Sequence, residues 1–279
     1  MTRPTTSSPP TGTPPRAVPV RRRARGRLRR FRGLVGVVVA FAIWALVSRT
    51  GLVSANDLPT IPAVAQAFGT SWSPILAGLG TTVEGLFLGL AIAAVAGAVL
   101  GVLVGLSLWA DAATDILVRM MRPMPSLALI PIAILVAGLG TEMTAGLVAF
   151  AAFWPVFINT RYAANSVDPR YVDTARSLGF SQWELVRRVV LPSVAPGFGT
   201  GLRISAGVAI VATISVELVA GTGGLGGFVL SAEQGGATAQ LYAGLIVGGV
   251  LGWLLNLVLS TLTRRLMPWQ AAVEKRGEN

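Results

Sequence analysis

The sequence contains no cysteine and no histidine, and it has a single lysine, Lys275. Disulfide bonds, metal sites built on thiolate or imidazole ligands, and catalytic mechanisms that need histidine or cysteine are therefore excluded. The phosphate-binding pattern G-x-x-x-x-G-K-[ST] is also missing, so we do not expect this chain to hydrolyse nucleotides. We expect no catalytic residue, no metal ion and no cofactor on this chain.

Charged residues are scarce: they make up 13% of the 279 residues, whereas hydrophobic residues make up 53%. Soluble domains carry about 25% charged residues, so the deficit indicates a polytopic membrane protein. The sequence predicts an all-α membrane bundle of six transmembrane helices, the third of which is short and contains Pro131. The candidate spans are residues 34–53, 81–108, 126–141, 143–160, 201–220 and 241–263.

The arginines are distributed asymmetrically along the chain, which has a formal net charge of +11. Ten arginines precede residue 33 and others follow the second, fourth and sixth spans, whereas the opposite side carries only Arg49. Loops rich in lysine and arginine stay in the cytoplasm. We therefore expect both termini in the cytoplasm, with anionic lipid headgroups rather than nucleic acid as the partner of the basic N-terminus.

Composition divides the chain into three regions. Residues 1–32 are rich in proline, threonine and serine and then in arginine, and we expect them to be disordered. Residues 33–266 form the transmembrane domain, in which residues 54–80 lie outside and include a short surface helix. Residues 267–279 form a cytoplasmic tail.

The polar segment 168–192 lies between two apolar spans, and it reads as a compact helix-turn-helix. Asp168 is placed to cap the first helix, Pro169 suits its first position, and Gly179 suits the left-handed residue after its end. Such a structured loop predicts a docking site for a cytoplasmic partner.

A second short helix is expected directly after this glycine. Ser181 and Glu184 have the spacing of a capping box, in which each side chain accepts a hydrogen bond from the other residue's backbone N–H. Trp183 begins the apolar face of this helix, and Pro192 is expected to end it.

Small residues recur at every fourth position of the second span, where they would let another helix approach closely. We expect this row to be a helix-packing surface. It consists of Gly85, Gly89, Ala93, Gly97, Gly101 and Gly105. A shorter row in the sixth span is equally explained by a composition rich in glycine and alanine; it consists of Gly244, Gly248 and Gly252.

Polar residues inside the predicted spans are few, and Glu84, Glu217 and Asn256 are the main ones. An ionisable side chain within a span is a functional candidate. Both glutamates lie near the outer ends of their spans, where water can reach them. Glu217 therefore fits either a structural position or a gate in a substrate pathway, and Asn256 fits a hydrogen bond between helices.

The spacing inside residues 168–192 resembles the EAA loop of ABC importer permeases, whose pattern is E-A-A-x-x-x-G, nine residues, then I-x-L-P. The second alanine, the glycine, the leucine and the proline are kept, and aspartate, threonine and valine replace the other three residues. The matching residues are Asp173, Thr174, Ala175, Gly179, Val189, Leu191 and Pro192. Residues 122–140, 153–179 and 222–230 also resemble the nitrate, sulfonate and taurine branch of these permeases.

This resemblance implies the permease of a type I importer in the bacterial plasma membrane. Two permease subunits, expected to be copies of one chain, would form the pathway, and separate ATPase subunits would hydrolyse ATP. A binding protein outside the cell would deliver a small anion such as an aliphatic sulfonate, taurine or nitrate. Relatives in this branch also carry thiamine-precursor pyrimidines.

The resemblance further implies that the EAA loop transmits movement from the ATPase to the spans. Asp173 would offer charge to the ATPase, Ala175 would keep the contact surface slim, and Gly179 would form the elbow. Leu191 and Pro192 would anchor the return to the membrane.

Three other functions fit the sequence less well than that of an importer permease. An ion-coupled secondary transporter would need paired broken helices and midplane ligands, which the sequence does not show. An intramembrane enzyme could use Ser126, Ser205 or Ser215, but no histidine is available as a base. A structural scaffold would leave the capped loop without a purpose.

Overall fold

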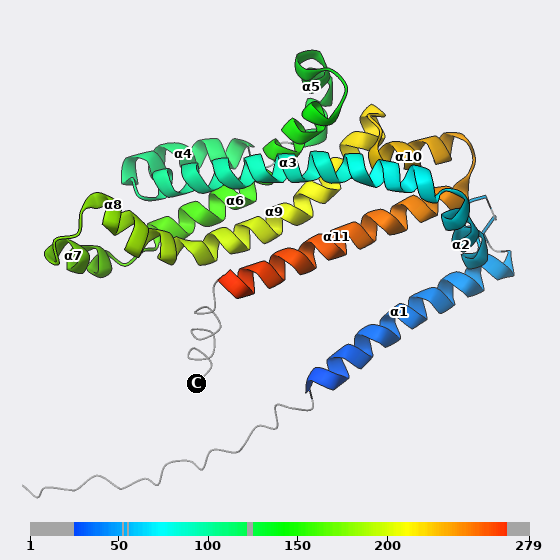
Figure 1. The fold of residues 1–279 in the computed structure, drawn as a ribbon, viewed down its shortest axis with the longest axis horizontal. Coiled ribbons are helices and arrows are strands. Elements are labelled where there is room, and N and C mark those ends of the chain that lie inside the picture. Colours follow the sequence, from blue (N-terminus) through cyan, green and yellow to red (C-terminus); the bar gives the residue numbers. More distant parts are fainter. Residues whose placement is uncertain (1–24, 52, 55, 122–124, 267–279) are drawn as a thin grey trace, which may run out of the picture. The chain divides into compact units, whose positions relative to one another are not determined.

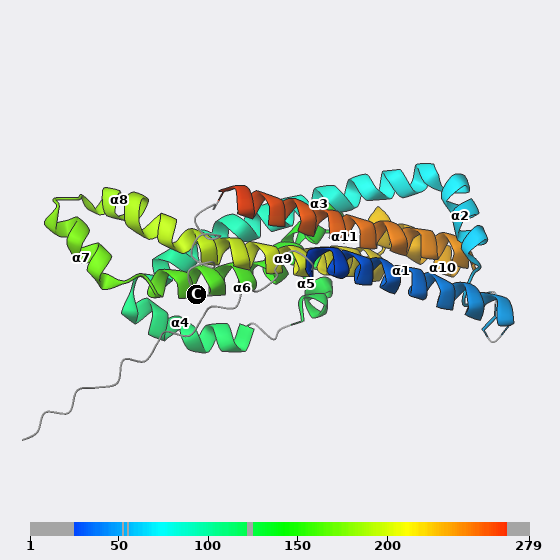
Figure 2. The ribbon, with the colours of Figure 1, turned by 90° about the horizontal axis from the view of Figure 1, so that it is seen from below.

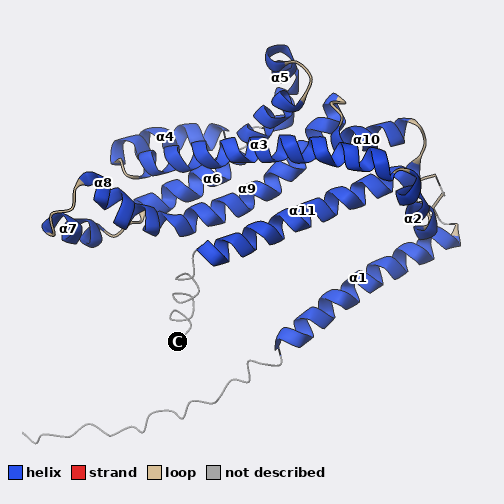
Figure 3. Cartoon of the chain, viewed as in Figure 1, coloured by secondary structure: helices blue, strands red, loops and turns tan. Residues whose placement is uncertain are grey.

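The computed structural model describes residues 25–51, 53–54, 56–121 and 125–266, and every regular element in these ranges is a helix (Figure 3). The predicted all-α class is therefore confirmed. The chain divides into two compact units, residues 1–52 and residues 53–279.

The first unit contains the helix α1 (Arg25–Thr50), whose apolar part is Val35–Thr50. The helix begins inside the stretch 1–32 that was expected to be disordered, because arginine is a good helix former and extends an apolar helix that follows it. The rest of that stretch, residues 1–24, and the expected tail 267–279 lie outside the described residues.

The second unit is built on long helices that lie side by side (Figures 1 and 2). Short helices cover its two ends, with α7 and α8 at one end and α2 and α10 at the other. In chain order the elements are α2 (Ile61–Thr70), α3 (Trp72–Gly105), α4 (Leu108–Met121), η1 (Ser126–Leu129), α5 (Ile130–Ala137), α6 (Thr141–Asn165), α7 (Pro169–Ser177), α8 (Gln182–Leu185), η2 (Val186–Val190), α9 (Leu191–Ala220), α10 (Gly224–Gln234) and α11 (Thr238–Leu266).

Four helices among the described residues are long and apolar enough to cross a membrane. They span Trp72–Gly105, Thr141–Asn165, Gln182–Ala220 and Thr238–Arg265, and they match four of the six predicted spans. The short helix expected outside the membrane corresponds to α2.

The predicted third span, residues 126–141, is not a straight transmembrane helix. It consists of η1 followed by α5, whose 8 residues extend about 12 Å, well short of a hydrocarbon core of about 30 Å. Pro125 has an extended backbone before η1, and Gly138 ends α5 with a φ of +72°. Together, α4 and the segment of η1 and α5 are long and apolar enough for one span, but the two parts are bent by 83° relative to each other.

The core of the second unit lies where α3, α6 and α9 meet. All six members of the small-residue row on α3 are buried, and the glycines among them face α6. A Cβ atom at Gly89 would lie 2.7 Å from the side chain of Val148, and one at Gly101 would lie 2.7 Å from Cβ of Thr160. These helices therefore approach too closely for any side chain at those positions.

The shorter row on α11 also faces neighbouring helices. A Cβ atom at Gly244 would lie 2.8 Å from the side chain of Val229 on α10, and one at Gly248 would lie 3.0 Å from the side chain of Ile214 on α9. The row therefore contributes to packing rather than to a lipid-facing surface. Asn256 on the same helix is exposed, so the interhelical hydrogen bond expected for it is not formed within the described residues.

Candidate functional site

The end of the bundle formed by residues 168–192, here called the α7–α8 projection, has the predicted local geometry. The carboxylate of Asp168 accepts a hydrogen bond from the backbone N–H of Arg170 at 2.9 Å, and Pro169 follows at the first position of α7. Gly179 has a φ of +80°, a conformation that residues with a Cβ atom rarely adopt. The predicted cap and elbow are confirmed.

The predicted capping box at the start of α8 is also confirmed. The backbone N–H of Ser181 donates to the carboxylate of Glu184 at 3.1 Å, and the backbone N–H of Glu184 donates to the hydroxyl of Ser181 at 3.3 Å. The reciprocal bonds fix the direction in which α8 leaves the elbow.

Pro192 does not end the second helix as expected. The helix is continuous from Gln182 to Ala220, over 39 residues, and it passes through the wider π-helical turn Val186–Val190 just before the proline. Because this turn changes the hydrogen-bond pattern, Pro192 falls in the first turn of α9, where its missing N–H is tolerated. The α7–α8 projection is thus joined to α9 without a flexible linker.

The residues matched to the EAA pattern differ in exposure. Asp173, Thr174 and Gly179 are exposed at the surface of the projection, and Leu191 is 45% exposed where the chain returns to the bundle. Ala175 is only 5% exposed, because it packs inside the elbow. Its carbonyl accepts a hydrogen bond at 3.1 Å from the N–H of Phe180, which closes the elbow.

Three large apolar side chains of the α7–α8 projection are exposed. Tyr171 is 65% exposed, Leu178 71% and Trp183 69%. The helical spacing had indicated an apolar face for the second helix, and Val190 of that face is buried, but these three side chains remain largely exposed. An exposed apolar surface of this kind, next to polar side chains, marks an interaction site.

A second feature lies near the opposite end, where Glu217 of α9 is only 2% exposed. Its carboxylate accepts hydrogen bonds at 2.9 Å from the hydroxyl of Thr82 on α3 and from the backbone N–H of Gly226 on α10. The hydroxyl of Thr82 in turn accepts a hydrogen bond from the N–H of Leu225 at 2.8 Å. The expectation that water reaches Glu217 was therefore wrong, because α3 and α10 cover it.

Two glycines of the 222–230 segment lie so close to Glu217 that a side chain at either position would clash with it. A Cβ atom at Gly226 would lie 2.6 Å from Cβ of Glu217, and Gly224 faces the carboxyl group even more closely. The sequence signal for this cluster was an acidic residue followed by a glycine-rich turn, but its partner Thr82 could not be identified from spacing.

A third feature, missed by the sequence analysis, joins α4 to α6. The guanidinium of Arg161, whose side chain is 5% exposed, bonds the carboxylate of Asp111 and donates to the carbonyl of Asp111 at 3.0 Å. A second carboxylate, that of Asp115, lies 3.6 Å away. Arg161 is therefore a buried and paired residue, not one of the free arginines that flank a span.

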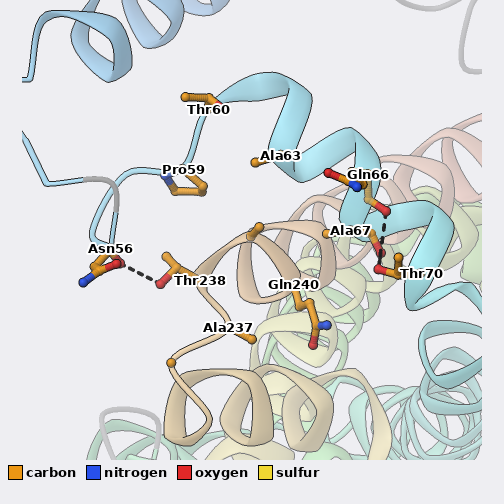
Figure 4. A pocket seen from close by; sticks show the side chains of 12 residues that line it. Asn56, Pro59, Thr60, Ala63, Gln66, Ala67, Thr70, Ala237, Thr238 and Gln240 are labelled. Carbon is orange, nitrogen blue, oxygen red and sulfur yellow. Dashed lines mark hydrogen bonds between the residues drawn. The ribbon is translucent and has the colours of Figure 1, made fainter.

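The end formed by α2 carries a pocket of about 450 Å³ (Figure 4). Pro59, Gln66 and Thr70 line it from the α2 side, and Ala237, just before α11, and Gln240, in its first turn, line it from the other side. The hydroxyl of Thr238 donates to the backbone carbonyl of Asn56 at 2.6 Å and ties the two sides together. Within the described part of the chain, no group of three acidic side chains could hold a metal ion.

The comparison with known protein families agrees with this architecture. Residues 95–271 match the family of binding-protein-dependent transport system inner membrane components. The chain belongs to this family, the permeases of ABC importers. The permease is 32% identical over 248 residues to the putative aliphatic sulfonates transport permease SsuC of Bacillus subtilis, a match that covers 87% of this chain and 89% of the relative.

Two further proteins support the family and the fold. The taurine transport system permease TauC of Escherichia coli is 31% identical to the permease over 245 residues, covering 85% of this chain and 89% of the relative. An inward-facing structure of the MetNI methionine ABC transporter matches the fold with a TM-score of 0.60, covering 71% of this chain and 97% of that one at 20% identity.

Proposed function

We propose that this permease imports a small anion and is driven through the α7–α8 projection by a separate ATPase. The exposed apolar surface of Tyr171, Leu178 and Trp183, held rigidly on α9, is the observation that carries the proposal. With the projection as the ATPase site, this end of the bundle is cytoplasmic, and the arginines before and after the spans support a cytoplasmic position for both chain termini. The α2 end then faces outside.

The residues of the projection divide the coupling role between them. Asp173 and Thr174 are exposed on α7 and contribute polar contacts to the ATPase. Gly179 and the buried Ala175 hold the elbow, while Val189, Leu191 and Pro192 connect it to α9. A movement of the ATPase would pass along this continuous helix into the membrane.

The substrate class rests on the relatives. SsuC and TauC are named for aliphatic sulfonates and for taurine, and both substrates present a sulfonate group. We propose a sulfonate or another small oxyanion such as nitrate as the substrate. The permease itself carries out no catalysis, because ATP hydrolysis belongs to the partner.

The proposed partners occupy different surfaces. A second copy of the permease completes the pathway, and lipid covers the apolar faces. The pocket between Asn56, Gln66 and Thr238 lies on the α2 end, where a binding protein would dock to deliver the substrate. We do not propose nucleic acid as a partner, because the arginines lie next to the membrane spans, where anionic lipid headgroups would bind them.

Cross-linking tests the coupling site directly. Since the chain has no cysteine, Leu178→Cys provides a single thiol on the projection, and Leu88→Cys provides a matched exposed thiol on α3. In native membranes, we expect a short cross-linker to join the Leu178→Cys variant, but not the Leu88→Cys variant, to a nucleotide-hydrolysing subunit. Equal recovery from both positions, or none from Leu178→Cys, would refute the proposed coupling site.

A further inference from the structure

The face of α9 that points away from the core carries polar residues. Between residues 200 and 211 the exposed positions of α9 recur at helical spacing; they are the polar Thr200 and Arg203 together with Ile204, Gly207 and Val211. By contrast, the exposed face of α3 between residues 85 and 106 is entirely apolar; it consists of Phe87, Leu88, Ala91, Ile92, Val95, Val99, Leu100, Leu103 and Leu106. The two faces are therefore made for different surroundings.

Arg203 lies at the same depth as the apolar face of α3. Gly97 of α3 and Gly201 of α9 both pack against Val156 of α6, so these two glycines are level in the bundle. At this level, α3 exposes Val95 by 66% and Val99 by 52%. Arg203 follows Gly201 by two residues, or about 3 Å along the helix, and thus lies deep in the membrane-spanning region.

An exposed arginine at this depth needs water or a counter-charge. Arg203 makes no ion pair with any residue in the described ranges. The helix α1 cannot neutralise it, since Arg25–Thr50 contains no acidic residue. A charged side chain facing lipid at this depth is costly, so such residues line water-filled cavities or meet partners.

A groove runs beside this arginine. A pocket of about 460 Å³ lies between η1, α6 and α9, and its polar lining includes Ser126, Trp154 and Asn159. The indole N–H of Trp154 is buried and has no acceptor among the described residues. Ile204, the residue next to Arg203, completes the lining from α9.

The groove continues along α9 toward Ser215. A neighbouring pocket of about 430 Å³ shares Ser126 and Ile204 and adds Gly207, one turn from Arg203. Neither pocket contains a carboxylate. The lining of the groove therefore includes hydroxyl, amide and indole groups but no carboxylate, and the exposed Arg203 lies next to it, directly before Ile204, without lining either pocket.

We propose that this groove, with Arg203 at its edge, is the wall of the permeation pathway that attracts a small oxyanion. This assignment rests on the proposed importer function and deepens it by naming the residues that select the charge of the substrate. In a dimer whose twofold axis is parallel to the membrane normal, equivalent residues of the two copies lie at the same depth in the membrane. Two Arg203 side chains would then face the pathway at one level, and their joint field would attract an anion.

The acidic residues of α4 and α9 either lie at another depth than Arg203 or are already paired. Glu217 is 14 positions further along α9, about 21 Å away, and it is bonded to Thr82 and Gly226. Asp111 and Asp115 are held by Arg161. A second copy of the described ranges would therefore bring none of these three carboxylates to Arg203 at the depth that symmetry allows.

Variants with a single cysteine test whether water reaches this groove and whether its electrostatic potential favours anions. Thr200→Cys places a thiol one turn from Arg203, and Val95→Cys and Val99→Cys place thiols at the same depth on α3. Each is tested in native membranes that carry the full transporter, with and without ATP. The probes are 2-sulfonatoethyl methanethiosulfonate, which is an anionic sulfonate, and its cationic trimethylammonium counterpart.

We expect the Thr200→Cys variant to react with both reagents and to favour the anionic one, whereas both α3 thiols stay unreactive. Adding Arg203→Gln should lower the ratio of anionic to cationic rates by about tenfold. Arg203→Lys should preserve the ratio, and so should Arg264→Gln at the end of α11.

Two results would overturn this inference: a thiol at position 200 that reacts no faster than those on α3, or a rate ratio that Arg203→Gln leaves unchanged. Neither result depends on the ATPase cross-link at Leu178. A failed cross-link with an intact rate ratio would instead refute the proposed coupling site and keep the cationic groove.

Discussion

The hydroxyl of Thr82 and the carboxylate of Glu217 are joined by a 2.9 Å hydrogen bond across 135 positions of sequence. Through this bond α3, α9 and the first turn of α10 meet at one buried point. The hydroxyl of Thr82 both donates and accepts, and one carboxylate oxygen of Glu217 accepts two hydrogen bonds, which favours keeping an ionisable group in a protein interior.

Replacing Thr82 by valine tests this point, because the shape is kept and the hydroxyl is lost. The N–H of Leu225 would lose its acceptor, and the carboxylate would lose one donor. Leaving such groups unpaired costs about 1–3 kcal/mol, so we expect a lower thermal unfolding temperature in detergent. Thr81→Val, one residue away and outside the cluster, should leave that temperature unchanged.

Closing the gap at Gly101 tests the packing of α3 on α6. A Cβ atom there would lie 2.7 Å from Cβ of Thr160 and 2.9 Å from the carbonyl oxygen of Phe157. Gly101→Ala should therefore destabilise the permease by about 1–3 kcal/mol, as overpacking does. Gly80→Ala on the same helix meets nothing within 4 Å and should be neutral or stabilising in the same assay. Equal stability of the two variants would argue against the close packing.

The ion pair between α4 and α6 gives a third prediction. Asp111→Asn leaves the buried guanidinium of Arg161 without its nearest carboxylate, and breaking a buried pair in this way costs about 3 kcal/mol. We expect earlier unfolding and faster proteolysis of the variant. Asp115→Asn should have a smaller effect, since its carboxylate lies 3.6 Å from Arg161 and is 37% exposed.

The elbow of the α7–α8 projection gives a fourth prediction. Gly179 has open space around it but a φ of +80°, so Gly179→Val would strain the backbone without a clash. We expect this variant to insert into the membrane normally, while recovery of the ATPase with the permease and ATP-dependent uptake of taurine are lost. Gly80→Val serves as the matched control. Normal uptake by the Gly179→Val variant would contradict the coupling role of the elbow.

Local rules predicted the projection well, because capping is decided by residues within a few positions of each other. The cap at Asp168, the box of Ser181 and Glu184, and the left-handed Gly179 all needed only their own neighbours in sequence. Pro192 misled for a related reason: whether a proline ends a helix depends on the hydrogen-bond register before it, and the π-helical turn changed that register.

Tertiary relationships could not be predicted in the same way. Hydropathy places Glu217 near the end of a span, but only the fold brings Thr82 and α10 over it. Arg203 lies near the start of the predicted span 201–220, and only the packing of Gly201 on Val156 shows that it lies deep in the bundle. The third span failed because hydropathy cannot report that α5 ends at Ala137, where Gly138 takes a φ of +72°.

The unbroken helix from Gln182 to Ala220 has a mechanical consequence. Its 39 residues form a rod about 58 Å long, fastened near one tip by Glu217 and carrying the exposed Trp183 at the other. When such a rod pivots about its fastened tip, sideways travel grows in proportion to distance from the pivot. Arg203, less than halfway along, would travel less than half as far as Trp183.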